Sequence, residues 1–225
     1  MEQWAILVAG GSGLRMGAPL PKQFLPLAGK PILVHTIELF LNFLKDINRI
    51  RVVIPAEHFS TWVQIAPEHL KNVTLVKGGT NRFESVQNGL STIPNTGFVA
   101  IHDGVRPLAT EHLIQTSYSL AITKGSAIPL VPLVDSVRHS NEGNWLPFDR
   151  ELMRVVQTPQ VFSTSLIKTA YANTTFSSTI TDDTMVFEKS GFIPHFLEGE
   201  RENIKITTPL DLLIGEAILL ERQRS

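Results

Sequence analysis

Residues able to hold a polyphosphate gather near the start of the chain. The small residues there are Ala9, Gly10, Gly11 and Gly13. Glycine lets the backbone come close to a ligand, and backbone N–H groups in such a turn can hold anions. Two cations, Arg15 and Lys22, follow in the same predicted loop. A glycine-rich turn followed by two cations predicts a polyphosphate site.

Two better-known glycine motifs do not match this loop. A dinucleotide site needs the spacing G-x-G-x-x-G, whereas three residues separate Gly13 from Gly17 here. A Walker loop needs Gly-Lys followed by Ser or Thr, and the sequence contains no such triplet. A tight turn with solvent-facing charges is the structural alternative to a ligand site.

A second glycine turn, at Gly78, Gly79 and Thr80, leads into a predicted helix that carries Arg82 and Ser85. An ordinary connection between a strand and a capped helix explains this pattern as well as a ligand site does. The functional alternative is a contact to the base or ribose of a nucleotide.

Asp103 follows an apolar run, residues 98–101, that is typical of a strand. An acidic residue at the carboxyl end of a strand stands where open α/β sheets bind ligands. It can hold Mg²⁺, which prefers one or two carboxylates plus phosphate oxygens. Arg106 could instead form a salt bridge that orients Asp103. His102 is interpreted as a packed or hydrogen-bonded residue.

The elements that position these residues alternate along the chain. Apolar runs closed by glycine or proline indicate strands, and apolar residues at helical spacing indicate helices. The predicted strands cover residues 4–8, 50–54, 73–76 and 98–101, and the predicted helices residues 32–44, 59–70, 82–90 and 111–123. This alternation predicts βαβ units, and therefore an α/β fold with a mostly parallel sheet.

The second half of the chain departs from that alternation. Residues 133–155 run into a polar turn cluster and back, which predicts a hairpin arm. A hairpin is marginally stable alone and must pack on something. An arm that docks on a second subunit and a simple surface insertion are both open at this point.

Lys205 is the last candidate for chemistry. It lies in a short apolar segment that is predicted to be a strand. A cation there needs an anion nearby, because an unpaired buried charge is costly. A strand over residues 192–197 and a helix started by Asp182 are predicted before it, and Thr208 is expected to cap a final helix.

Composition limits the class of protein. The 225 residues are predicted to form one domain, residues 1–225, with the arm inside it. A formal net charge of −1 argues against a general binder of nucleic acids or membrane surfaces. The absence of cysteine excludes disulfides and cysteine nucleophiles. With neither a signal-peptide pattern nor an apolar stretch of membrane-spanning length, a cytoplasmic protein is expected.

In their order and spacing, these segments resemble the 2-C-methyl-D-erythritol 4-phosphate cytidylyltransferase family of the non-mevalonate isoprenoid pathway. The segments are residues 9–24, 78–90, 102–107, 150–162, 181–182 and 203–212. The resemblance covers nearly the whole chain. It implies a nucleotidyltransferase-type, Rossmann-like α/β fold, with a mixed, mostly parallel sheet flanked by helices. It also implies CTP as substrate, Mg²⁺ as cofactor and a homodimer joined through the protruding β-arm.

The resemblance also implies roles for single residues. The residues expected to bind CTP are Ala9, Gly10, Gly11, Gly13, Gly79, Thr80, Ser85, Asp103 and Gly104, with Asp103 near the metal. The residues expected to bind the sugar phosphate are Asp135, Ser136, Arg150, Thr158, Thr181 and Lys205, with the arm serving the other subunit. The residues expected to act in catalysis are Arg15, Lys22, Arg150 and Lys205.

Two other functions stay open. A ribitol 5-phosphate cytidylyltransferase is a close relative with the same chemistry, although the residues around Asn88 and Asp182 look more like the methylerythritol enzyme. A nucleotide-binding protein without catalysis is the other alternative. It would have little need for all four of the residues Arg15, Lys22, Asp103 and Lys205.

Overall fold

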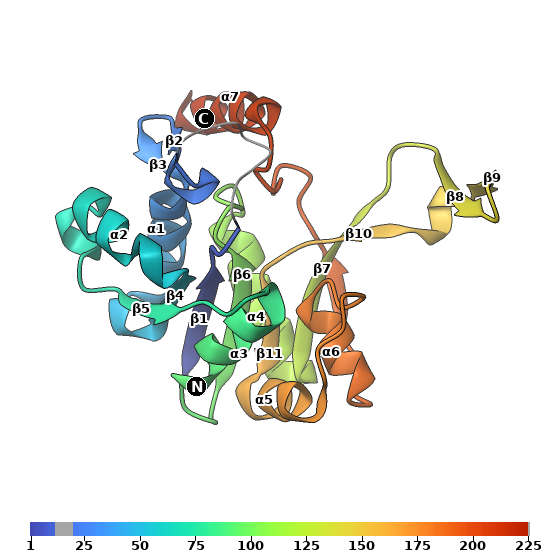
Figure 1. The fold of residues 1–225 in the computed structure, drawn as a ribbon, viewed down its shortest axis with the longest axis horizontal. Helices are drawn as coiled ribbons and strands as arrows, with labels where there is room; N and C mark the ends of the chain where they lie inside the picture. The colour runs from blue at the N-terminus through green and yellow to red at the C-terminus, as the bar shows by residue number, and fades with distance from the viewer. Residues whose placement is uncertain (12–19, 225) are drawn as a thin grey trace.

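An eight-stranded sheet forms the centre of the protein (Figure 1). The computed structural model describes residues 1–11 and 20–224. Along the sheet the strands follow the order β10, β7, β11, β6, β1, β4, β5, and β12 also pairs with β7. Their bounds are β1 Gln3–Val8, β4 Ile50–Ile54, β5 Thr74–Lys77, β6 Phe98–Asp103, β7 Ser126–Pro132, β10 Arg154–Val156, β11 Gln160–Ser163 and β12 Phe196–Glu198.

The direction of the strands divides the sheet into two parts. Strand β1 runs parallel to both β4 and β6, and β4 runs parallel to β5. Strand β11 is antiparallel to β6 and β7, and β10 is antiparallel to β7. The predicted mixed, mostly parallel α/β sheet is therefore confirmed, and the antiparallel strands all come from the half of the chain that departs from the βαβ alternation.

Helices cover both faces of the sheet. Successive side chains of a strand point to opposite faces, so the apolar strands present apolar side chains to the helices on each face. Ala5 and Leu7 pack against α1 and α4, whereas Ile6 and Val8 pack against α3, α5 and α6. The helices are α1 Ile32–Leu44, α2 Phe59–Ile65, α3 Arg82–Ser91, α4 Glu111–Lys124, α5 Thr164–Asn173, α6 Asp183–Lys189 and α7 Pro209–Arg224. The parallel strands β1, β4 and β6 are buried along most of their length on both faces, which holds their ends in place.

Three helix starts near the carboxyl edge of the sheet are fixed by side-chain caps. Asn81 accepts a hydrogen bond from the Glu84 N–H, and Asp182 accepts one from the Met185 N–H. Thr110 does the same for α4. Such caps satisfy N–H groups that a helix start leaves without partners.

The hairpin β8 (Val137–Asn141) and β9 (Asn144–Phe148) extends far from the body of the molecule (Figure 1). Glu142 and Gly143 make the turn in the left-handed backbone conformation, which glycine adopts without strain. Two long connections join this hairpin to β7 and β10. The hairpin predicted within residues 133–155 is present.

Three predicted elements differ from the structure. The segment around Lys205 is not a strand; it crosses the end of the sheet as an irregular segment, where the Ile206 N–H donates to the Val105 carbonyl. The strand predicted at residues 192–197 is reduced to β12, and the helix predicted at 59–70 ends at Ile65. Among the described residues, no helix has the length and apolar character needed to cross a bilayer.

Candidate active site

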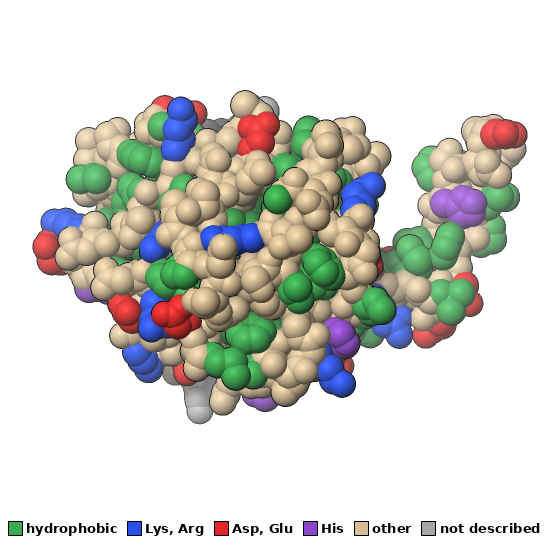
Figure 2. All heavy atoms as spheres, turned by 90° about the horizontal axis from the view of Figure 1, so that it is seen from below, with side chains coloured by type: hydrophobic (Ala, Val, Ile, Leu, Met, Phe, Trp, Pro, Cys, Tyr) green, Lys and Arg blue, Asp and Glu red, His purple; other side chains and the backbone are tan. Residues whose placement is uncertain are grey.

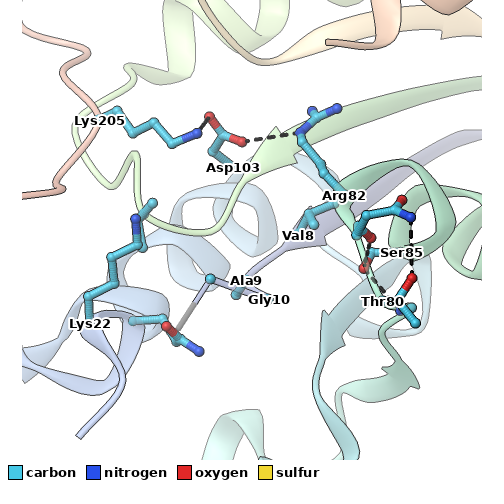
Figure 3. A pocket seen from close by; sticks show the side chains of 14 residues that line it. Val8, Ala9, Gly10, Lys22, Thr80, Arg82, Ser85, Asp103 and Lys205 are labelled. Carbon is cyan, nitrogen blue, oxygen red and sulfur yellow. Dashed lines mark hydrogen bonds and ion pairs between the residues drawn. The ribbon is translucent and has the colours of Figure 1, made fainter. Parts of the chain in front are cut away.

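A pocket opens where β1, β5 and β6 end, at the carboxyl edge of the parallel strands (Figure 3). Its lining is Val8, Ala9, Gly10, Gly11, Lys22, Gln23, Gly79, Thr80, Asn81, Arg82, Ser85, Asp103, Val105 and Lys205. Ligands of open α/β sheets bind at this edge. The structure thus joins the two glycine turns, Asp103 and Lys205 around one cavity.

The first glycine turn supplies one side of this pocket. Gly10 and Gly11 follow β1 directly, and a side chain at Gly11 would meet the Lys22 side chain, whose Cε would lie 3.4 Å away. Lys22 begins the short helix Lys22–Phe24 and is only 9% exposed. The predicted residues Gly13 and Arg15 lie outside the described part of the chain.

The second glycine turn supplies the opposite side. A Cβ at Gly79 would stand 2.2 Å from Glu84 Cβ, so only glycine fits there. The Gly79 N–H donates to Ser85 Oγ at 3.0 Å, and the Thr80 N–H and hydroxyl both donate to Glu84 at 2.8 Å. This turn is therefore rigid before any ligand arrives.

Asp103 is surrounded by three cations. Its Oδ2 lies 3.0 Å from Lys205 Nζ and 3.2 Å from Arg106 Nε, and its Oδ1 lies 3.7 Å from Arg82 Nε. Burial alone would raise the pKa of this carboxyl, but Arg82, Lys205 and Arg106 hold that pKa far below its ordinary value. Asp103 therefore stays ionised. The salt bridge to Arg106 that the sequence offered as an alternative is present, as one of the three ion pairs of Asp103.

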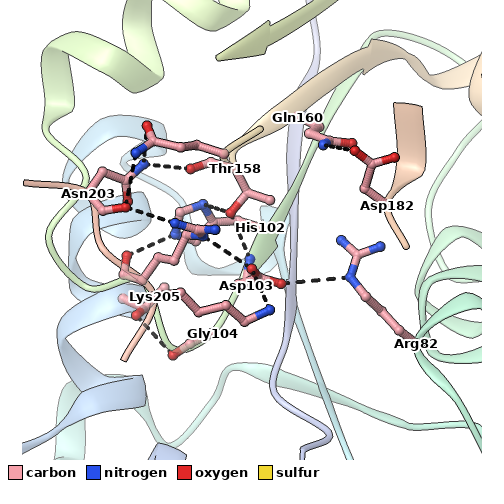
Figure 4. A network of polar contacts seen from close by, with 12 residues as sticks. Arg82, His102, Asp103, Gly104, Thr158, Gln160, Asp182, Asn203 and Lys205 are labelled. Atoms are coloured by element: carbon pink, nitrogen blue, oxygen red, sulfur yellow. Dashed lines mark hydrogen bonds and ion pairs between the residues drawn. The ribbon is translucent and has the colours of Figure 1, made fainter. Parts of the chain in front are cut away.

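A second pocket adjoins the first. Its lining is Arg82, Asp103, Arg106, Val156, Gln157, Thr158, Gln160, Thr181, Asp182 and Lys205. Arg82, Asp103 and Lys205 belong to both pockets, and we name these three residues the shared wall (Figures 3 and 4). The predicted residues Thr158 and Thr181 line the second pocket only.

Thr158 is already engaged by its neighbours. Its hydroxyl accepts a hydrogen bond from the Asp103 N–H at 3.1 Å and lies 3.0 Å from His102 Nδ1. His102 Nε2 lies 3.0 Å from the Arg106 carbonyl, which can only accept, so Nε2 carries the proton and Nδ1 accepts from Thr158. His102 is fully buried, and burial lowers its pKa to about 4. It is a packed, hydrogen-bonded histidine as expected, and it orients the backbone at Asp103.

Four predicted residues are not part of either pocket in the described chain. Gly104 donates its N–H to the Val8 carbonyl, and its Cα packs so closely that a Cβ would lie 2.7 Å from Ala9 Cβ. Asp135, Ser136 and Arg150 lie at the base of the arm and are exposed. Arg150 donates to the Val134 carbonyl at 2.7 Å.

The sequence interpretation missed the partners that hold the shared wall. Arg82 forms a two-pronged salt bridge with the buried Asp183, and the Asn203 carbonyl accepts from Arg106 at 2.8 Å. Gln157 donates to the carbonyls of Glu200 and Asn203. These contacts join positions up to 101 residues apart, so no local pattern reveals them. Gln23 also lines the first pocket with a buried amide that has no hydrogen-bond partner among the described residues.

A carboxylate that can hold a metal is present, but a complete protein metal site is not. In the described part of the chain, no group of three His, Cys, Asp or Glu side chains comes together. Among the described residues, Asp103 Oδ1 has only the longer contact to Arg82, so this oxygen can accept a cation. A single carboxylate fits Mg²⁺ only where phosphate oxygens supply further ligands.

The mixed α/β sheet and the two adjoining cation-lined pockets define a nucleotidyltransferase-type protein. A solved structure of 4-diphosphocytidyl-2C-methyl-D-erythritol synthase from Anaerococcus prevotii matches it with a TM-score of 0.81 and 28% identity, over 97% of this chain and 98% of that one. The cytidylyltransferase structure from Thermus thermophilus matches with a TM-score of 0.76 and 27% identity, over 96% and 98% of the two chains.

Sequence comparison narrows the class to a family. The family model of 2-C-methyl-D-erythritol 4-phosphate cytidylyltransferase matches residues 4–221. The proteins of that name from Bacteroides thetaiotaomicron and Bacteroides fragilis are 46% and 43% identical, over 97% of this chain and 100% of each relative. The chain belongs to the 2-C-methyl-D-erythritol 4-phosphate cytidylyltransferase family.

Proposed function

We propose that this protein transfers the cytidylyl group of CTP to 2-C-methyl-D-erythritol 4-phosphate, in the cytoplasm. The products are 4-diphosphocytidyl-2-C-methyl-D-erythritol and pyrophosphate. The observation that carries the proposal is the shared wall, which lies between two pockets in a chain of this family. A reaction that joins two phosphates needs two binding sites that meet at the reacting atoms.

The proposed reaction needs positioning and charge rather than a strong base. A phosphate oxygen of the sugar attacks the α-phosphorus of CTP, a new O–P bond forms, and the bond to the bridging oxygen breaks. The electron pair leaves with pyrophosphate. Because the attacking oxygen is already an anion, the obstacle is the repulsion between two anions. Cations held in place before the reaction lower that barrier.

Particular residues fit these roles. In the first pocket, Lys22 neutralises the triphosphate of CTP, with Arg15 proposed beside it, and the glycine turns accommodate the nucleotide. Lys205 Nζ lies in the shared wall, where it can reach the phosphate of either substrate. Thr181 lies in the second pocket, at the start of α6, and suits the sugar phosphate.

Asp103 is the residue proposed to hold Mg²⁺. Its carboxylate stays ionised, it faces the nucleotide pocket, and Mg²⁺ accepts one carboxylate together with phosphate oxygens. When bound, the metal would supply further positive charge to the phosphates. The protein's own part is to keep Asp103 charged and fixed, through Arg82, Arg106 and Lys205.

The arm is proposed to join two copies of the chain. Its side chains Trp145, Leu146, Phe148 and Leu152 are 65%, 41%, 43% and 78% exposed. Figure 2 shows such apolar side chains along the projecting arm. Exposed apolar residues on a hairpin whose two strands, among the described residues, pair only with each other favour a second subunit. Docking there would carry Asp135, Ser136 and Arg150 to the sugar phosphate of the partner.

Pyrophosphate release tests the proposed function. The purified protein is incubated with CTP, Mg²⁺ and either 2-C-methyl-D-erythritol 4-phosphate or ribitol 5-phosphate, and CTP alone is the control. We expect release only with the methylerythritol phosphate. Faster release with ribitol 5-phosphate would assign the other cytidylyltransferase activity, and no release with either acceptor would leave a nucleotide-binding protein.

A further inference from the structure

Arg82 borders both pockets from the start of a helix. It is the first residue of α3, directly after the glycine turn that lines the nucleotide pocket. Its guanidinium also lines the second pocket, beside Asp182 and Thr181 at the start of α6. In Figure 4 its side chain extends between Asp103 and Asp182.

The guanidinium is fixed on one side by Asp183. Arg82 Nη1 donates to Asp183 Oδ1 at 3.0 Å, and Nη2 donates to Oδ2 at 2.6 Å. Asp183 is fully buried as the first residue of α6, and it also accepts a hydrogen bond of 2.6 Å from the Tyr171 hydroxyl. The start of α3 is therefore attached to the start of α6 by a charged, two-pronged contact, the strongest kind of hydrogen-bonded pair.

The same guanidinium faces Asp103 with its remaining nitrogen. Arg82 Nε lies 3.7 Å from Asp103 Oδ1, while Lys205 and Arg106 occupy the other oxygen. One arginine thus contacts the helix start of the nucleotide pocket, the helix start of the acceptor pocket and the carboxylate between them. Although burial opposes its charged form, the pKa of Arg82 is raised by Asp183 and Asp103, so it remains a cation.

We propose that Arg82 is a positioning residue that sets the distance between the two pockets and the direction of the Asp103 carboxylate. It acts through Asp183 and Asp103 and needs no contact with either substrate. The inference rests on the proposed function, because the two pockets are taken to hold the two reactants. Misplacing reacting groups by about 1 Å can cost roughly 10²-fold in rate.

Arginine is required here because of its shape. Its planar fork supplies two parallel N–H groups to one carboxylate and a third to another direction, whereas lysine offers a single point charge. Arg82→Lys therefore keeps the positive charge of the shared wall and removes only the two-pronged hydrogen-bond geometry. Arg51→Lys is the matched control, because Arg51 is also partly buried and donates to backbone carbonyls. It lies near the amino end of β4, whereas the pockets lie at the carboxyl edge of the parallel strands.

The experiment measures kcat for pyrophosphate release, the Kd of each substrate by calorimetry and the melting temperature. For Arg82→Lys we expect kcat to fall about 10²-fold, while each Kd changes less than about threefold, because the other contacts of each pocket remain. Arg51→Lys should keep kcat. A lower melting temperature of Arg82→Lys with unchanged kcat would make Arg82 merely structural and overturn the inference. If Arg82→Lys does not fold, Asp183→Asn, which loosens the same fork, must lower kcat with little change in either Kd.

A second readout does not depend on activity. The chain has no cysteine, so spin labels can be placed at Gln87→Cys on α3 and Lys189→Cys on α6 alone. We expect the distribution of distances between the labels to broaden with Arg82→Lys and to stay unchanged with Arg51→Lys. Equal distance distributions would contradict the inference. This test remains valid even if the unsubstituted protein releases no pyrophosphate, because the lack of release by itself contradicts only the proposed function.

Discussion

The shared wall and the arm differ in where their side chains make contacts. In the wall, Asp103, Arg82 and Lys205 come from three distant segments and are joined by ion pairs within one chain. In the arm, neighbouring residues of one hairpin expose apolar side chains and contact little else of the chain. The contacts of the wall lie within a single chain, whereas the arm is proposed to dock on a second subunit. Under that proposal the nucleotide half of the site is preformed, and the acceptor half depends on assembly.

The largest effect should come from removing a cation of the preformed half. We expect Lys22→Ala and Lys205→Ala each to lower kcat about 10²–10³-fold, because each loses a fixed positive charge beside the phosphates. Steady-state release of pyrophosphate measures this loss. Lys71→Ala is the control, because Lys71 pairs with the exposed Glu68 and is not among the lining residues of either pocket. Near-normal turnover in both pocket variants would contradict the proposed roles of Lys22 and Lys205.

The arm should show a smaller and more selective effect. Arg150→Ala is expected to raise the KM for the sugar phosphate about tenfold and to leave the Kd for CTP unchanged, because the loss of one charge-assisted contact costs roughly 1.5 kcal/mol. Arg138→Ala is the control, since Arg138 donates to the Trp145 carbonyl within the arm. An equal loss for both substrates would contradict the separation of wall and arm.

Mixing two impaired variants, assayed at a sugar phosphate concentration below the KM, tests whether the arm acts on the partner. Arg150→Ala and Lys22→Ala subunits are combined, and light scattering first establishes that they form dimers. If the arm serves the other subunit, each mixed dimer contains one site with both residues intact, and roughly a quarter of all sites recover activity under random pairing. No recovery in mixed dimers would place the arm in its own subunit's site.

A last prediction concerns stability rather than turnover: stability should depend on pH through His102. Its pKa in the folded chain is about 4, below the ordinary 6.5, so the unfolded chain binds this proton first as the pH falls. The free energy of unfolding should therefore decrease between pH 6.5 and 4, by up to about 1.4 kcal/mol per pH unit. In His102→Gln this contribution disappears, and urea titrations at several pH values would measure a shallower slope. Equal slopes for the two proteins would show that the pKa of His102 is not lowered in the folded chain.

Local patterns predicted the strands, most helices and the pocket at the carboxyl edge, because hydrophobic periodicity and glycine turns act over short stretches of chain. The prediction of a strand around Lys205 was wrong, because apolar residues such as Ile206 can pack against a turn without joining a sheet. The pair of Arg82 with Asp183 could not be predicted, because it depends on how α3 and α6 meet. The roles of Arg15 and Gly13 stay predictions, as does the arm's contribution to a partner.

The shared wall also limits how such an enzyme can change its substrate during evolution. Arg82, Asp103 and Lys205 border both pockets, so a substitution there alters nucleotide handling and acceptor handling at once. Thr181 borders the second pocket alone, and the residues of the arm are proposed to serve the acceptor alone. A descendant that keeps CTP but takes another sugar phosphate would accumulate its changes in those residues, while the wall stays as it is. Under the proposed function, the protein thus separates its chemical centre from a recognition element that can change independently.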